Sequence, residues 1–133
     1  MTDKTLLLVE DDAKITLALG IRLRAAGYTV VTAPDAVHAM AQAIRHTPDA
    51  VVLDINLPGG DGFLVAERLR ATPATAETPI LFVTASKKPG LHERAHAIGA
   101  AGLIEKPFSA TQLLEALAKA LGKTSGDPFE AAA

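Results

Sequence analysis

The sequence contains no cysteine, which excludes disulfide bonds and thiolate zinc sites. Its formal net charge of −2 provides no basic surface for nucleic acid. No apolar run reaches the roughly 18 residues that a membrane-spanning helix needs. The first residues, MTDKTLLLVE, also lack the basic head and long apolar run of a signal peptide. We therefore expect a soluble cytoplasmic protein that binds neither nucleic acid nor membranes.

The length of 133 residues predicts one domain with a hydrophobic core of its own. We expect this domain to cover residues 4–122. The segment after Gly122 shows no periodicity, so residues 123–133 are predicted to form a disordered C-terminal tail.

Short apolar runs alternate with segments of helical spacing along the whole chain. The runs suit strands buried on both faces, as in parallel sheets, and they are TLLLVE (5–10), YTVVTA (28–33), AVVLD (50–54), PILFVT (79–84) and AGLIEK (101–106). The intervening segments carry helix-start and helix-stop signals, such as the capping box Ser109-x-x-Gln112 and the final glycine Gly122. This alternation predicts an α/β fold, a doubly wound parallel sheet with helices on both faces.

Reactive side chains stand where the predicted strands end, and they are Glu10-Asp11-Asp12, Asp54, Thr84 and Lys106. In a parallel sheet these ends meet at one edge, near the point where strand order reverses. Crowded carboxylates at that edge predict a hard cation such as Mg²⁺. Asp54 can then act as a nucleophile toward phosphorus. Lys106 and the Thr84 hydroxyl can bind the phosphoryl oxygens.

The motifs LLLVEDD, VVLDINLPGGDG, ILFVTAS and LIEKPF occur in that order at the ends of the first, third, fourth and fifth strands. Together they resemble the receiver domain of two-component signalling, the fold of the chemotaxis response regulator, over about residues 4–122. The resemblance implies a flavodoxin-like sheet with strand order 2-1-3-4-5 and five flanking helices.

The resemblance also implies a role for each matching residue. Asp54 corresponds to the phosphoacceptor, and Asp11 and Glu10 correspond to the Mg²⁺-binding acids. Asn56 corresponds to the residue whose backbone carbonyl contacts the metal. Asp12 would instead cap the first helix. Thr84 corresponds to the switch hydroxyl, and Lys106 to the family's lysine, with a cis bond to Pro107.

The implied function is a Mg²⁺-dependent switch in a histidine-to-aspartate phosphorelay. The phosphodonor would be a sensor histidine kinase or a histidine phosphotransfer protein, and a downstream protein would read the phosphorylated state. Such a domain catalyses its own phosphorylation and dephosphorylation and is not a turnover enzyme. Asn56 and Ser86 stand at the positions that tune phosphoryl lifetime in the family. No output domain follows Gly122, so we expect a stand-alone receiver or a piece of a larger regulator.

One position departs from the family pattern. The family often carries Tyr or Phe three residues before the lysine, where this chain has Leu103. The segment Ala101-Gly102-Leu103 also replaces the acidic-acidic-aromatic run of winged-helix regulators, which argues against their mode of dimerisation. The usual aromatic partner of Thr84 is thus replaced by an aliphatic side chain.

Alternatives from other classes stay open at this point. One is a degenerate receiver that acts only as a protein-binding module. Another is a zinc protease, because His92-Glu93-x-x-His96 matches a metalloprotease motif. That zinc would need a third ligand downstream, and no histidine follows His96. Glu105 and Glu115 are possible ligands, although they fall on a strand end and on another helix. A dehalogenase-like phosphohydrolase would want a second aspartate where this chain has Asn56.

Overall fold

The computed structural model describes residues 3–124 and confirms the predicted alternation of strands and helices. The strands form one parallel sheet in the order β2-β1-β3-β4-β5, as the family resemblance implied. The strands are β1 (Thr5–Val9), β2 (Thr29–Ala33), β3 (Ala50–Asp54), β4 (Ile80–Thr84) and β5 (Gly102–Glu105). The helices are α1 (Ala13–Ala25), α2 (Ala36–His46), α3 (Gly62–Ala71), α4 (Leu91–Ala97) and α5 (Ala110–Thr124).

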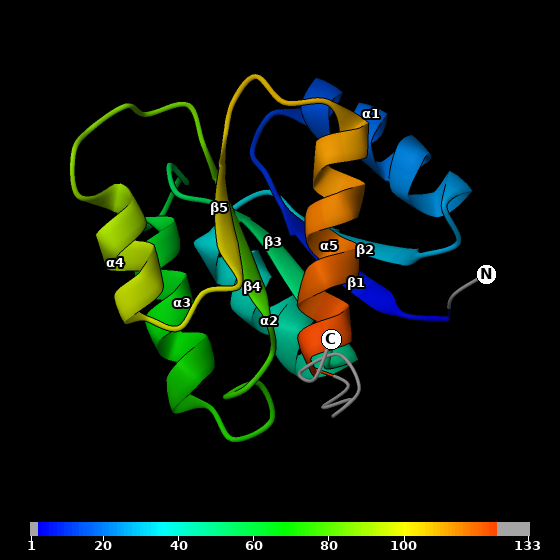
Figure 1. Cartoon of the computed structure of the whole chain (residues 1–133). Helices are drawn as coiled ribbons and strands as arrows, with labels where there is room; N and C mark the ends of the chain where they lie inside the picture. Colours follow the sequence, from blue (N-terminus) through cyan, green and yellow to red (C-terminus); the bar gives the residue numbers. More distant parts are fainter. Residues whose placement is uncertain (1–2, 125–133) are drawn as a thin grey trace.

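Helices cover both faces of this sheet, because side chains alternate across each strand. Leu7, Leu53 and Phe82 pack into a cluster with residues of α2, α3 and α4. Leu8 and Val52 point the other way and pack against α1 and α5. Figure 1 shows the two layers, with α1 and α5 on one side of the strands and α3 and α4 on the other. The apolar strand runs of the sequence are therefore explained by burial on two faces.

Helix starts follow the predicted capping signals. Asp12, Asp35 and Asp61 each accept hydrogen bonds from backbone N–H groups in the first turn of α1, α2 and α3. At α5, the Ser109 hydroxyl accepts from the Gln112 N–H, and the Gln112 side chain accepts from the Ser109 N–H. The capping box read from the sequence is therefore confirmed.

The predicted end of the last helix was wrong by two residues. α5 passes through Gly122 and continues to Thr124. A glycine inside a helix costs only about 1 kcal/mol relative to alanine, so it does not end a helix by itself. The rest of the predicted tail, residues 125–133, lies outside the described residues. Within the described part of the chain, no helix has the length and apolar character needed to cross a membrane.

Strand order reverses between β1 and β3, which are neighbours in the sheet although β2 separates them in sequence. Loops leaving the carboxyl ends of these strands diverge at this point and open a crevice. The start of α3 closes one wall of it, where the Gly62 N–H donates to the Ile55 carbonyl at 2.7 Å. A Cβ at Gly62 would collide with the Asp54 carbonyl oxygen and lie 2.9 Å from the Ile55 Cα.

We expect Gly62→Ala to lower the free energy of unfolding by about 1–3 kcal/mol, the range for overpacking a close-packed site. The clash is with backbone, which cannot rotate away. Gly20→Ala is the matched control, because its Cβ would meet only the flexible end of Arg24 in the interior of α1. The free energy of unfolding of that control should rise by about 0.5–1 kcal/mol, because alanine has a higher helix propensity than glycine. Urea unfolding of the two variants measures both values, and equal stability would contradict the close approach of α3 to β3.

Candidate functional site

Carboxylates from two strands converge in the crevice. Glu10 follows β1, and Asp54 ends β3; both side chains are buried, whereas the neighbouring Asp11 is exposed. One oxygen from each of the three lies within 4.8 Å of the others. This is the only group of three potential metal-ligating side chains found among residues 3–124. The structure thus brings together the three acids that the sequence predicted to be neighbours.

A single lysine bridges the two buried acids. The Lys106 Nζ lies 2.7 Å from Glu10 Oε1 and 2.9 Å from Asp54 Oδ2. Lys106 follows β5, so its side chain passes over the end of β4 to reach these oxygens. The Lys106–Pro107 peptide bond is cis, as predicted from the family resemblance. Such charge-assisted hydrogen bonds are the strongest contacts that a carboxylate can make in a protein.

Backbone N–H groups hold the other carboxylate oxygens. Asp54 Oδ1 accepts from the Asn56 N–H at 2.9 Å, and Glu10 Oε2 accepts from the Asp12 N–H at 3.1 Å. The Asp12 side chain itself caps α1 by accepting from the N–H groups of Lys14 and Ile15. The Asp12 side chain is therefore occupied by the helix, which confirms the capping role that the family resemblance implied.

The pKa values of Glu10 and Lys106 are both raised. Burial raises the pKa of Glu10, the negative charge of Asp54 adds to the effect, and hydrogen bonds from Lys106 and Asp12 offset part of it. Burial alone would lower the pKa of Lys106, but its hydrogen bonds to Glu10 and Asp54 outweigh that cost and raise it. The raised pKa of Lys106 holds its side chain as a cation, and the raised pKa of Glu10 disfavours ionisation of that carboxyl.

Thr84 ends β4 and is fully buried. Its hydroxyl oxygen accepts a hydrogen bond from the Ser86 N–H at 2.9 Å, so in this structure it serves the backbone of the following loop. Beside it lies a hollow of about 300 Å³, lined by Thr84, Leu91 and Leu103 among others. Leu103 is half-buried and packs against the cluster that includes Phe82. The aliphatic residue at this position therefore leaves room next to the threonine.

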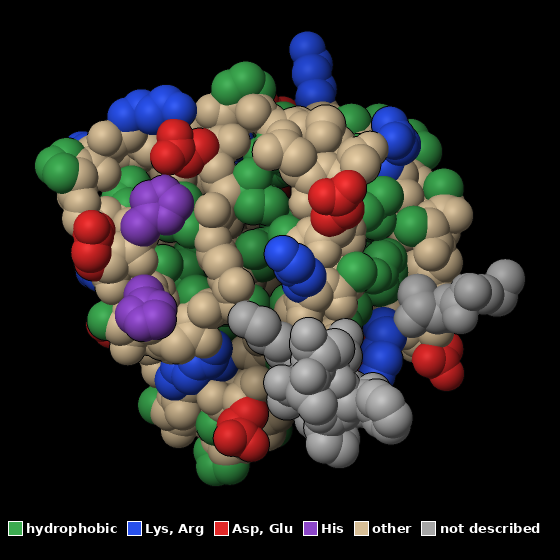
Figure 2. All heavy atoms as spheres, viewed as in Figure 1, with side chains coloured by type: hydrophobic (Ala, Val, Ile, Leu, Met, Phe, Trp, Pro, Cys, Tyr) green, Lys and Arg blue, Asp and Glu red, His purple; other side chains and the backbone are tan. Residues whose placement is uncertain are grey.

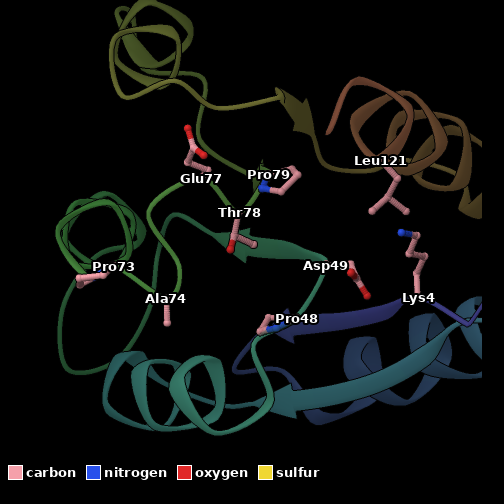
Figure 3. Close-up of a pocket in the computed structure, with 9 residues that line it drawn as sticks. All are labelled: Lys4, Pro48, Asp49, Pro73, Ala74, Glu77, Thr78, Pro79 and Leu121. Carbon is pink, nitrogen blue, oxygen red and sulfur yellow. The ribbon is translucent and has the colours of Figure 1, made fainter. Parts of the chain in front are cut away.

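A second hollow lies far from the carboxylates. It has a volume of about 410 Å³ and sits at the opposite end of the strands, between Pro48, Pro79 and α5 (Figure 3). Its one strand-edge acid, Asp49, accepts a hydrogen bond from the Thr5 N–H at 2.7 Å. This acid ties β1 to the start of β3, which gives Asp49 a structural role.

Two contacts near the site had no counterpart in the sequence reasoning. Glu105 Oε1 accepts from the Lys87 Nζ at 2.6 Å, and Glu105 Oε2 lies 3.4 Å from the His92 Nε2. Arg70 donates to the carbonyls of Ile98 and Gly99 and so fixes the end of α4. Neither contact has a local sequence signal, because each joins residues that lie at least 13 positions apart.

Comparisons with known proteins agree with this geometry. The profile of the response regulator receiver domain family matches residues 6–118. The phosphate regulon transcriptional regulatory protein PhoB of Pseudomonas aeruginosa is 34% identical over 131 residues, which cover 98% of this chain and 57% of that protein. This chain therefore spans little more than half the length of that relative.

Solved structures show the same fold. The chemotaxis response regulator CheY4 of Vibrio cholerae superimposes with a TM-score of 0.83 at 33% identity, covering 90% of this chain and 99% of that one. A CheY-like receiver domain protein from Methanospirillum hungatei JF-1 gives a TM-score of 0.87 at 24% identity, covering 95% of this chain and 99% of that one. At that identity the second match supports the fold alone.

The raised pKa of Glu10 predicts an unusual pH dependence in the absence of divalent metal. A carboxyl whose folded pKa exceeds its unfolded value, 4.5, binds more protons in the folded state. Its contribution to stability is fully present below pH 4.5 and is lost as the pH rises through the folded pKa. Urea unfolding in the presence of a chelator, repeated over a range of pH, measures this contribution. The free energy of unfolding should contain it in the wild type and lack it in Glu10→Gln. Parallel pH profiles for the two proteins would contradict the raised pKa.

Proposed function

The chain belongs to the response regulator receiver domain family, and we propose that Asp54 is the residue that accepts the phosphoryl group. The observation that carries this proposal is a buried strand-end carboxylate, paired with Lys106 at 2.9 Å and aligned by the Asn56 N–H. A carboxylate held in one orientation at the mouth of a crevice is positioned for in-line attack.

The pocket fits a divalent cation. Glu10, Asp11 and Asp54 bring three carboxylates within reach of one ion, and Lys106 supplies one positive charge, which leaves two negative charges when all are ionised. We propose Mg²⁺ as the ion, held by these three acids and by the backbone carbonyl of Asn56. When bound, Mg²⁺ supplies charge neutralisation and coordinates phosphoryl oxygens.

The chain's own residues perform the transfer. An Asp54 carboxylate oxygen attacks the phosphorus of a phosphohistidine, forming a P–O bond as the P–N bond breaks and the leaving imidazole takes a proton. Lys106 already lies against that carboxylate and neutralises charge on the transferred group. The same side chains later assist water in hydrolysing the acyl phosphate, so each event restores the starting protein rather than turning over an external substrate.

The readout is proposed to be a population shift of α4 and β5. For the Thr84 hydroxyl to reach the phosphoryl group, its hydrogen bond with the Ser86 N–H must break. The hollow beside Leu103 gives the loop after β4 space to rearrange. This mechanism needs no aromatic side chain in β5, which accommodates the departure at Leu103.

The partners follow from this chemistry. We propose that a sensor histidine kinase or a histidine phosphotransfer protein donates the phosphoryl group in the cytoplasm, and that a downstream protein recognises the shifted surface. No contact with nucleic acid is proposed through this domain, because the sequence as a whole has a net charge of −2 and so no excess of basic residues. PhoB is described as a transcriptional regulatory protein, but a similar output for the present protein is not part of the proposal.

We expect the wild-type protein to gain one phosphoryl group when incubated with acetyl phosphate and Mg²⁺, and Asp54→Asn to gain none. An amide is neither the nucleophile nor a good metal ligand. Asp35→Asn is the matched control, because it makes the same change at an acid outside the pocket. Asp35 caps α2, and asparagine caps helices equally well. Intact-protein mass measures the gain with and without Mg²⁺. Labelling of Asp54→Asn equal to wild type would place the acceptor elsewhere.

Lys106→Ala should keep Mg²⁺ binding but lower stability without metal by up to about 3 kcal/mol, because two buried carboxylates lose their cation. The ammonium is partly exposed, so the loss stays at or below the buried-pair range. Added Mg²⁺ should restore most of the lost stability. The control variant Lys119→Ala, on the surface of α5, should change neither Mg²⁺ binding nor stability. Phosphoryl-dependent amide shifts in α4 and β5 should shrink in Lys106→Ala. A full-sized response would refute the role of Lys106.

A further inference from the structure

Two exposed histidines and a nearby carboxylate lie outside the acidic pocket, on the surface formed by α4 and β5. His92 and His96 occupy positions one turn apart on α4, and both side chains are exposed. Residues four apart project from the same face of a helix. Figure 2 shows two imidazole side chains one above the other over α4, with acidic and basic groups beside them. Imidazole pairs at this spacing bind zinc in proteins.

A carboxylate from β5 completes this group. Glu105 and Lys106 are adjacent, so their side chains point to opposite faces of the strand. Lys106 enters the acidic pocket, whereas Glu105 turns toward α4 and brings its Oε2 to 3.4 Å from the His92 Nε2. Sequence reasoning named Glu105 as a possible third ligand but could not place its strand end beside the histidines. The structure brings it directly to the histidine.

The separation of these two atoms is informative. At 3.4 Å the contact is longer than the usual 2.9–3.0 Å of an N–H···O hydrogen bond. Around a tetrahedral zinc ion, ligand atoms about 2.0–2.2 Å from the metal lie about 3.3–3.5 Å from one another. The His92–Glu105 hydrogen bond therefore already holds two potential ligand atoms at a separation that a zinc ion could span without moving them far. Lys87 binds the other oxygen of Glu105 at 2.6 Å, which leaves Oε2 directed at His92.

We propose that His92, His96 and Glu105 form a surface site for a divalent transition-metal ion such as Zn²⁺, with water as the fourth ligand. His96 joins by rotation of its exposed ring, since the three ligand atoms are not yet gathered as the acids of the pocket are. Imidazole nitrogen selects zinc or copper over magnesium, so the two sites take different ions. The site binds an ion and is not a protease centre.

The bound ion joins α4 to the end of β5 at the surface that the proposed switch moves. The unphosphorylated chain binds the ion on its own. If α4 and β5 shift as proposed above, and the ion binds the two arrangements with different affinity, phosphorylation changes the affinity for the ion. The coupling rests on the proposed function, whereas the site rests only on the three side chains.

Calorimetric titration of the unphosphorylated chain with Zn²⁺, in excess Mg²⁺ to occupy the acidic pocket, tests the site. We expect one Zn²⁺ ion to bind per chain. His92→Ala and His96→Ala should each lower the Zn²⁺ affinity at least about tenfold, because even the loss of a group that only supports a metal ligand has an effect of that size. Glu105→Gln should also weaken binding. His38→Ala removes an exposed histidine on α2 and should leave binding unchanged.

Equal Zn²⁺ affinity in wild type and His92→Ala would overturn the proposed site. A loss of Zn²⁺ binding in Asp11→Asn, but not in the histidine variants, would also overturn it, because the ion would then lie in the acidic pocket. The double variant His92→Ala/His96→Ala should still gain a Mg²⁺-dependent phosphoryl group. That gain shows that the double variant is folded. It also separates failure of the zinc site from failure of the proposed phosphorelay function.

Discussion

The contact on which the site depends is the Lys106 ammonium held between Glu10 and Asp54. Its nitrogen lies 2.7 Å from a Glu10 oxygen and 2.9 Å from an Asp54 oxygen, so one cation pairs with two buried carboxylates. Its hydrogen bond to Glu10 offsets part of the rise in the pKa of Glu10 that burial and the charge of Asp54 cause. The lysine also spans the sheet. It leaves β5, crosses the end of β4 and meets acids from β3 and β1. Four strand ends are thereby drawn into one crevice, at a cost in desolvation that only a paired arrangement can offset.

This pairing leaves the crevice short of positive charge. One ammonium faces three carboxylates, so an incoming phosphoryl group meets a net negative pocket unless a divalent ion is present. This charge count of the side chains is the physical reason for the proposed requirement for metal. The backbone reinforces it, because the N–H groups of Asn56 and Asp12 each occupy one carboxylate oxygen and fix where the remaining lone pairs point.

The fold was predictable because its signals are local. Strands buried on both faces read as apolar runs, and capping residues such as Asp61 and Ser109 mark helix starts within four positions. The site was predictable because parallel strands deliver their ends to one edge. The contacts of Arg70 with the carbonyls after α4 were not, because they join segments 28 and 29 residues apart with no pattern between them. The pairing of Glu105 with His92 was missed for the same reason.

Those unpredicted contacts decide how α4 can move. Its first residues follow Gly90, which offers no side-chain cap, whereas Arg70 holds its far end through two carbonyls. Midway along, the Arg94 guanidinium lies 4.1 Å from the centre of the Phe63 ring, which ties the helix to α3. The end of α4 beside Thr84 therefore lacks a side-chain cap, and its first turn reaches β5 through the 3.4 Å contact between His92 and Glu105. A rearrangement after β4 that leaves the Arg70 contacts intact would displace this turn more than the far end of the helix. An ion shared by His92 and Glu105 would strengthen the contact that already joins this turn to β5.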